Sequence, residues 1–236
     1  MGDEPPFPGN RRYTPCRYPK ATYAAMVSLL DEQIGGLLRL LKELDLYENT
    51  LLVFTGGNRV TDDIYVDELE TYRSEIAVNR RISGKLSLAE KKLHVPMIVS
   101  WPKEIVAGTT SGILTSSYDV MATFCDLAHI EAPVTDGISI YPALLGKNRK
   151  QKEHECLYWE HSASDGEVAV RFGSWKAIVG EVMKGNRTIR LFDMQTDPNE
   201  QCDVAAQNPE IVEQALQFIK REHTSPHLKI FDFPTW

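Results

Sequence analysis

The amino-acid sequence predicts an α/β fold that is followed by a small α+β subdomain. Three observations lead to this prediction: a helix-like apolar stripe near the start, two short continuous apolar runs after it, and several strand-like runs in the last third. A helix followed by separate buried strands is typical of α/β folds, whereas short strands in succession predict an antiparallel sheet.

The first elements follow from proline content and apolar spacing. Residues 1–19 are rich in proline and predict an extended lead-in, because proline removes backbone donors and fixes φ. From Tyr23 to Leu44 apolar residues recur with a helical period, which predicts an amphipathic helix. Residues 51–54 form a short apolar run before a polar turn, and this favours a buried parallel strand. The helical stripe consists of Met26, Val27, Leu30, Ile34, Leu37, Leu38, Leu41 and Leu44.

The middle of the chain predicts one excursion, one strand and one helix. Residues 59–84 are polar and charged, which indicates a surface excursion. Residues 95–101 predict a second buried strand, which Pro102 ends. Residues 119–130 predict an amphipathic helix with Asp119 near its start. Its apolar side consists of Val120, Met121, Phe124, Leu127 and Ala128.

After Gly146 the pattern changes to short strands separated by polar turns, which predicts an antiparallel sheet. Asn208 and Pro209 predict a helix start, with Asn208 as its cap. We therefore expect a partial α/β domain over residues 1–146 and a C-terminal subdomain over residues 147–236. The strand-like runs are 157–159, 168–172, 175–179 and 189–192, and the helix would cover their sheet with Ile211, Val212, Ala215, Leu216 and Ile219.

Composition and charge exclude several classes of protein. Of the 236 residues, 42% are hydrophobic and 25% are charged, which argues against wholesale disorder and fibrous repeats. The net charge is -7 and no block of Lys or Arg occurs, so nucleic acid and anionic membranes are disfavoured as partners. No apolar run approaches the ~18 residues of a membrane helix. The sequence shows no signal peptide and leaves the compartment open.

The four cysteines lie far apart and have no zinc-binding spacing. We expect them to be buried thiols. They are Cys16, Cys125, Cys156 and Cys202.

Several short motifs follow one another along the chain. They include Leu30-Asp31-Glu32-Gln33-Ile34-Gly35, Leu51-Leu52-Val53-Phe54-Thr55, Val95-Pro96-Met97-Ile98-Val99-Ser100-Trp101-Pro102, Asp136-Gly137, Leu157-Tyr158-Trp159-Glu160, Gly173-Ser174-Trp175-Lys176 and Leu191-Phe192-Asp193. In this order they resemble the C-terminal half of a type I sulfatase, over roughly residues 13–205.

The resemblance implies the alkaline-phosphatase-like α/β fold and an arylsulfatase-like sulfuric ester hydrolase. It also implies Ca²⁺ or Mg²⁺ beside a formylglycine, and a sulfate ester or sulfated glycan as substrate. Negative charge builds on the sulfuryl oxygens as the ester bond breaks, so a hard cation and basic donors must face them. Family members are often secreted, periplasmic or lysosomal.

The resemblance also assigns site residues. Asn58 would ligate the metal ion, and Lys85 would be the catalytic lysine that binds the sulfate group; an exposed surface lysine is the alternative. His161 would lie in a loop that approaches the substrate pocket, although a lone loop histidine is more often simply solvated.

Two departures from the family bear on activity. The family loop Thr-Ser-Asp-Asn-Gly reads Thr55-Gly56-Gly57-Asn58-Arg59 here, so a glycine replaces a metal-ligating aspartate and weak metal binding is expected. The nucleophile motif, Cys or Ser followed two positions later by Pro or Ala and then by Arg two beyond, is absent from the sequence, and formylglycine with it.

We therefore expect a sulfatase half that is inactive alone and whose N-terminal half is missing. The alternative is a non-catalytic module that binds a sulfated glycan or docks a partner chain.

Overall fold

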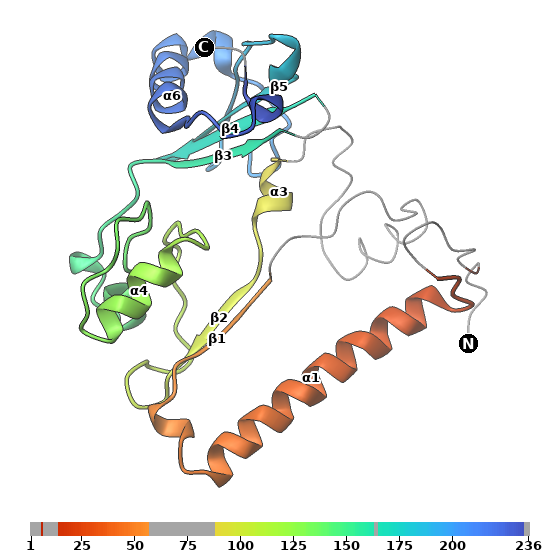
Figure 1. The fold of residues 1–236 in the computed structure, drawn as a ribbon, viewed down its shortest axis with the longest axis vertical. Helices are drawn as coiled ribbons and strands as arrows, with labels where there is room; N and C mark the ends of the chain where they lie inside the picture. Colours follow the sequence, from red (N-terminus) through yellow and green to blue (C-terminus); the bar gives the residue numbers. More distant parts are fainter. Residues whose placement is uncertain (1–5, 7–13, 57–87, 163–164, 234–236) are drawn as a thin grey trace. The chain divides into compact units, whose positions relative to one another are not determined.

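The computed structural model describes residue 6 and residues 14–56, 88–162 and 165–233 (Figure 1). The predicted excursion over residues 59–84 lies outside this part. The chain separates into two compact units, each of which is described by itself. The predicted domain boundary after residue 146 stays a prediction. The first unit comprises Met1–Leu52, Val60–Gly84 and Ser100–Lys103, and the second comprises Val53–Arg59, Lys85–Val99 and Glu104–Trp236.

The first unit is dominated by one long helix, α1 (Pro19–Glu43), followed by the short 3₁₀ helix η1 (Tyr47–Asn49). The helix begins earlier than predicted, because Pro19 fits the first turn, where its missing N–H breaks no hydrogen bond. None of the α1 residues is buried. No described helix is both long and apolar enough to cross a membrane.

Two short strands, β1 and β2, pair into a two-stranded sheet. Beyond the end of β1, the Gly56 N–H donates to the Pro96 carbonyl at 3.3 Å, and before β1 the Lys103 N–H donates to the Glu48 carbonyl at 3.1 Å. As the chain proceeds from Glu48 to Gly56, its hydrogen-bond partners go back from Lys103 to Pro96, so the two strands run antiparallel. The bounds are Leu52–Thr55 for β1 and Met97–Ser100 for β2.

The prediction of buried strands, the first of them parallel, is wrong on both counts. Phe54 and Ile98 are 40% and 63% exposed. A continuous apolar run fits a strand of either direction, and burial requires covering residues that the run itself does not specify.

The second sheet contains four strands in the order β3-β4-β5-β6, and all neighbours pair antiparallel. This confirms the predicted antiparallel sheet. Gly173 closes the β4–β5 turn with φ 50°, a left-handed conformation that glycine adopts without steric cost. The strands are β3 (Leu157–His161), β4 (Glu167–Phe172), β5 (Trp175–Gly180) and β6 (Arg190–Asp193).

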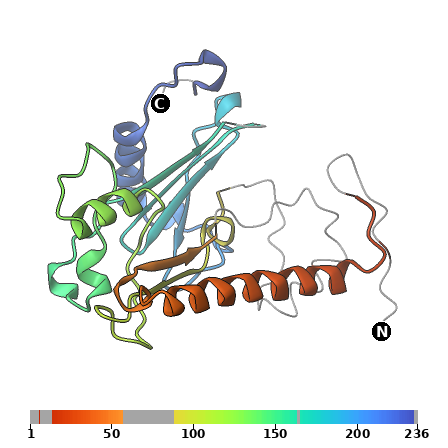
Figure 2. The same cartoon turned by 60° about the horizontal axis from the view of Figure 1, so that its bottom comes forward.

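One face of this sheet packs against helix α6 (Pro209–Glu222), which lies alongside the strands in Figures 1 and 2. Val168 and Val170 form a buried core with Ala215 and Ile219, and Ile211, Val212 and Leu216 pack against it. The predicted covering helix is confirmed. The predicted cap is not, because the Asn208 side-chain amide donates to the Val204 carbonyl instead.

The opposite face packs against the residues just before and within the short helix α3 (Glu90–Leu93). Leu88 is 6% exposed and packs against Ala169, Ile178 and Phe192. The two faces of one sheet therefore carry two separate cores.

Helix α4 (Asp119–Leu127) confirms the predicted element but not its buried side. Met121 and Phe124 are 54% and 48% exposed, whereas the buried residues include Asp119 and Thr123. Polar residues are buried here because each finds hydrogen-bond partners, as described below. The remaining short helices are α5 (Tyr141–Leu144), η2 (Asn148–Lys150), η3 (Val182–Lys184), η4 (Ala205–Gln207) and η5 (Lys229–Phe231).

Candidate functional site

Two of the three predicted site residues, Asn58 and Lys85, lie outside the described residues, together with Gly57 and Arg59. Their assignment stays a prediction. The third, His161, was predicted to lie in a loop, but it is the last residue of strand β3, where it pairs with Glu167, and its side chain is exposed.

His161 lies on the α3 side of the four-stranded sheet. It pairs directly with Glu167 on β4, and directly opposed residues of an antiparallel pair point to the same face. A Glu167 carboxylate oxygen accepts the backbone N–H of Leu88 at 3.0 Å. His161 therefore lies on the same face of the sheet as Leu88, which follows Lys85 by three positions.

The same face carries a buried set of charges, here named the Lys176 cluster, which comprises Lys176, Arg171, Glu90 and Glu200. Lys176 is 0% exposed, and its Nζ lies 3.0 Å from Glu90 Oε2 and 2.7 Å from Glu200 Oε1. Arg171 Nη1 lies 3.0 Å from Glu90 Oε1. Two cations and two carboxylates therefore balance one another, so the cluster has no net charge with which to bind an anion.

The Lys176 cluster also fixes the backbone at the start of α3. The Glu90 N–H donates to both Glu200 oxygens, at 3.1 and 3.2 Å. Side chains from β4, from β5 and from the loop before η4 thus meet at Glu90, directly after the buried Leu88 and Ala89. The segment 88–90 is held by charge, by hydrogen bonds and by apolar burial at once.

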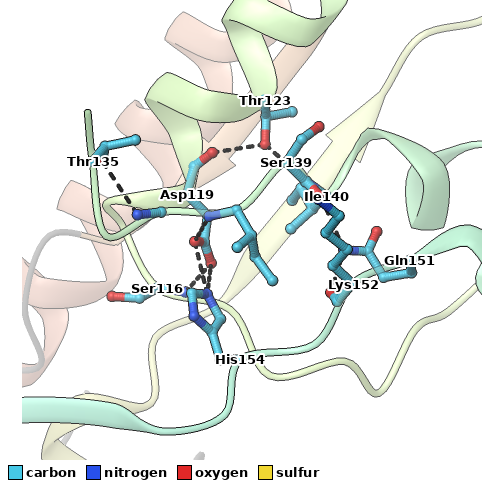
Figure 3. A network of polar contacts seen from close by, with 11 residues as sticks. Ser116, Asp119, Thr123, Thr135, Ser139, Ile140, Gln151, Lys152 and His154 are labelled. Atoms are coloured by element: carbon cyan, nitrogen blue, oxygen red, sulfur yellow. Dashed lines mark hydrogen bonds and ion pairs between the residues drawn. The ribbon is translucent and has the colours of Figure 1, made fainter. Parts of the chain in front are cut away.

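A second polar network surrounds Asp119 at the start of α4 (Figure 3). Its carboxylate accepts the N–H groups of Ser116 and Ile138 at 2.8 and 2.9 Å. His154 Nε2 lies 2.8 and 3.0 Å from the two carboxylate oxygens, and Asp119 and His154 are 1% and 7% exposed in their side chains. The Tyr118 ring meets the imidazole edge-on, with centroids 5.6 Å apart.

Glycine is required beside this network. A Cβ on Gly137 would lie 2.2 Å from the Tyr118 carbonyl oxygen, so only glycine lets the 136–138 turn bring Ile138 to Asp119. Thr123 extends the network, donating to the Asp119 carbonyl and accepting the Ile140 N–H. These contacts engage both oxygens of the carboxylate, so Asp119 connects the start of α4 to Ile138 and to His154.

The cysteines are all free thiols, as predicted, but only Cys125 is buried, whereas Cys202 is exposed. Burial raises the pKa of the Cys156 thiol to about 11, and the Glu222 carboxylate adds to the rise. The thiolate is the nucleophilic form of cysteine, so Cys156 is a poor nucleophile at neutral pH.

We expect Cys156 to react with iodoacetamide at pH 8 at least about tenfold more slowly than the exposed Cys202. Since its folded-state pKa lies above the ordinary 9.0, its contribution to stability is complete below pH 9 and is lost as pH rises through about 11. Mass spectrometry of a labelling time course measures both rates, and equal rates would contradict the burial argument.

The oxygen donors of the described residues do not form a complete calcium or magnesium site. Such ions take about six or more oxygen ligands. Among the residues that the structure describes, no three His, Cys, Asp or Glu side chains gather in a way that could hold a metal ion. The resemblance offers Asn58 alone, and Gly57 beside it has no side-chain oxygen.

Sequence reasoning missed both the Lys176 cluster and the Asp119–His154 pair. Lys176 belongs to one of the resemblance motifs, but its bond to Glu90 spans 86 positions, and His154 lies 35 positions after Asp119. No local pattern connects residues so far apart.

Two family models match the chain. The Sulfatase model matches residues 4–130, and the model of the C-terminal region of N-sulphoglucosamine sulphohydrolase matches residues 81–223. Together they cover both units of the fold.

Individual relatives agree with these matches. The chain is 28% identical over 219 residues to the N-acetylgalactosamine-6-O-sulfatase of Bacteroides thetaiotaomicron, across 86% of this chain and 42% of that protein. It is 26% identical over 202 residues to Arylsulfatase K of Bos taurus, across 81% of this chain and 34% of that protein. A solved structure from work on glycosaminoglycan metabolism by B. thetaiotaomicron superposes with a TM-score of 0.65 at 27% identity, covering 81% of this chain and 42% of that one. The chain therefore spans less than half the length of these relatives.

Proposed function

The chain belongs to the sulfatase family, and from this premise we propose that it forms the C-terminal half of a sulfuric ester hydrolase and does not hydrolyse sulfate esters by itself. The observation that carries the proposal is the absence of the nucleophile motif. No Cys or Ser in the sequence is followed two positions later by Pro or Ala and then by Arg two beyond. Without that motif the chain has no residue from which formylglycine forms.

In this proposal Lys85 binds the sulfate group in a site that an N-terminal half completes. A lysine is suited to this role because negative charge develops on the sulfuryl oxygens as the ester bond breaks. The anchoring of segment 88–90 supports the placement, since Leu88 follows Lys85 by three positions and is both buried and hydrogen-bonded to Glu167. A segment that is already fixed lowers the entropic cost of positioning the binding residue beside it.

His161 is proposed as a second substrate contact. Its exposed side chain and its position on the α3 face of the sheet support this assignment. The proposed substrate is a sulfated sugar, since the relatives include an N-acetylgalactosamine-6-O-sulfatase.

Asn58 is the one metal ligand that the chain contributes in this proposal. A bound Ca²⁺ or Mg²⁺ would supply positive charge at the sulfuryl oxygens. With glycine at position 57 the other ligands must come from an N-terminal half, so the chain alone binds the ion weakly.

The test supplies the missing half in trans. The chain is mixed with the part of the B. thetaiotaomicron N-acetylgalactosamine-6-O-sulfatase that lies outside the match, and sulfate release from a sulfated sugar and from 4-nitrocatechol sulfate is measured. We expect no release by the chain alone and measurable release by the mixture. Lys85→Ala should lower the restored kcat by about 100-fold, the loss typical of one oxyanion-stabilising donor.

The matched control is Lys147→Ala, which removes an exposed lysine elsewhere on the second unit. Restored activity that is indifferent to Lys85→Ala and Asn58→Ala would contradict the site assignment. A mixture that binds the sulfated sugar without releasing sulfate would favour the alternative, a non-catalytic binding module.

A further inference from the structure

A short run of basic residues follows helix α5 in the second unit. Four of the six residues 147–152 are basic, although the chain has no long block of like charge. Three of the four surround Gln151, and their side chains are exposed. None of these three forms an ion pair with another residue that the structure describes. They are Arg149, Lys150 and Lys152, here named the basic patch.

Gln151 fixes the backbone at the centre of the basic patch. Its amide oxygen accepts the Ala143 N–H at 3.1 Å, and its amide nitrogen donates to the Ser139 carbonyl at 2.9 Å. The same nitrogen donates to the Lys152 carbonyl at 2.8 Å. One side chain therefore joins three backbone groups in and around α5, while its basic neighbours are exposed to solvent.

Contacts on both sides of Gln151 hold the rest of this segment. Before it, the Lys150 N–H donates to the Lys147 carbonyl at 2.9 Å. After it, the His154 side chain is 7% exposed and lies 2.8 Å from the Asp119 carboxylate. The backbone that carries the basic patch is therefore held before any ligand binds. Because ordering a loop is one of the main costs of binding, this arrangement favours the capture of a ligand.

The chemistry of the basic patch suits a polyanion. Ammonium and guanidinium groups donate to the oxygens of anions such as phosphate and sulfate, and a guanidinium can do so through two parallel hydrogen bonds. Short runs rich in Lys and Arg are typical of patches that bind heparin or nucleic acid. The net charge of -7 weakens attraction to nucleic acid, whose binding draws on many phosphate contacts. A sulfated chain is favoured, because the proposed substrate is a sulfated sugar.

We propose that the basic patch is a binding site for a sulfated polysaccharide, formed by residues other than those assigned to catalysis. This inference rests on the proposed function, from which it takes the class of ligand. The patch holds sulfate groups of the polysaccharide other than the one whose ester is hydrolysed. A second attachment of this kind raises the effective concentration of the polymer, an advantage that a small aryl sulfate does not gain.

The test measures heparin binding by the full chain. Isothermal titration calorimetry with a heparin oligosaccharide gives the dissociation constant at low and at physiological ionic strength. Arg149→Gln with Lys150→Gln removes two charges from the patch. The matched control, Lys220→Gln with Lys229→Gln, removes two exposed lysines elsewhere in the second unit and changes the net charge equally. We expect the patch variant to weaken binding about fivefold or more with a smaller salt dependence, and the control to change it less than about twofold.

Several results would overturn the basic patch as a site for sulfated polysaccharide. One is the absence of heparin binding at low ionic strength, and another is an equal loss in the two double variants. Tighter binding of a single-stranded DNA of equal charge would assign the patch to nucleic acid instead. Equal binding of hyaluronan, a polymer that carries carboxylates without sulfate, would show that sulfate is not what the patch recognises.

Lys85→Ala separates this proposal from the catalytic one. Heparin binding needs no N-terminal half, so a mixture that fails to release sulfate would refute the catalytic proposal alone. Binding that the patch variant weakens and that Lys85→Ala leaves within about twofold would support the basic patch. A loss of binding confined to Lys85→Ala would overturn it.

Discussion

Replacing Lys176 with methionine is expected to lower the free energy of unfolding by about 3–5 kcal/mol. Methionine keeps most of the side-chain volume and removes the charge. Lys176 is 0% exposed and lies within 3.0 Å of both Glu90 and Glu200, so its loss leaves two carboxylates facing each other with Arg171 as the remaining cation. Breaking one side of a buried ion pair costs far more than the pair contributes, because the other charge stays desolvated.

Denaturant unfolding followed by circular dichroism measures the loss. Lys184→Met is the matched control, since Lys184 also contacts two carboxylates, Asp165 and Glu181, but is 57% exposed, and screened surface pairs contribute little. Adding Glu200→Gln to Lys176→Met should recover part of the stability. A loss for Lys176→Met no larger than that for Lys184→Met would show that the cluster does not hold α3 to the sheet.

Replacing Asp119 with alanine is expected to cost a comparable amount, about 3–5 kcal/mol, because it leaves several buried groups without a partner. The carboxylate accepts the N–H groups of Ser116 and Ile138 and pairs with His154, and each unsatisfied buried group costs about 1–3 kcal/mol. Asp119→Asn should lose less, since one acceptor oxygen remains.

Asp126 on the same helix provides the control. It is exposed and accepts one hydrogen bond, from Ser139 at 2.6 Å, so Asp126→Ala should cost about 1 kcal/mol or less. A double-mutant cycle between Asp119 and His154 separates their pair from the backbone contacts. Additive effects of the two substitutions would contradict the close pairing seen in Figure 3.

The elements with a clear local pattern could be predicted from the sequence. The four antiparallel strands lie where short apolar runs separated by polar turns predict them, and helix α6 lies where helical apolar spacing predicts it. The turn at Gly173 and the helix start at Pro209 also carry local signals.

The features that depend on distant residues could not be predicted. The direction of β1 and β2 follows from pairing between segments about 40 or more positions apart, which an apolar run does not encode. The buried side of α4 differs from its apolar side because Asp119 and Thr123 are satisfied by partners from the 136–154 region. Lys176 illustrates the same point, since nothing in its own segment marks a lysine that is fully buried.

The candidate site also combines residues that the sequence indicates with contacts that only the structure shows. The resemblance assigns Asn58, Lys85 and His161, and of these the structure places His161 alone. What the structure adds is the anchoring of the segment after Lys85, through contacts with Glu167, Lys176 and Glu200.

The most direct test of the central claim is sulfate release by the purified chain alone, with and without millimolar Ca²⁺, followed by ion chromatography. The claim that this sulfatase half lacks its own nucleophile predicts no release above that of the Lys85→Ala variant in either condition. Release above that variant, whether or not it requires calcium, would mean that the chain carries a complete catalytic site and would contradict the account.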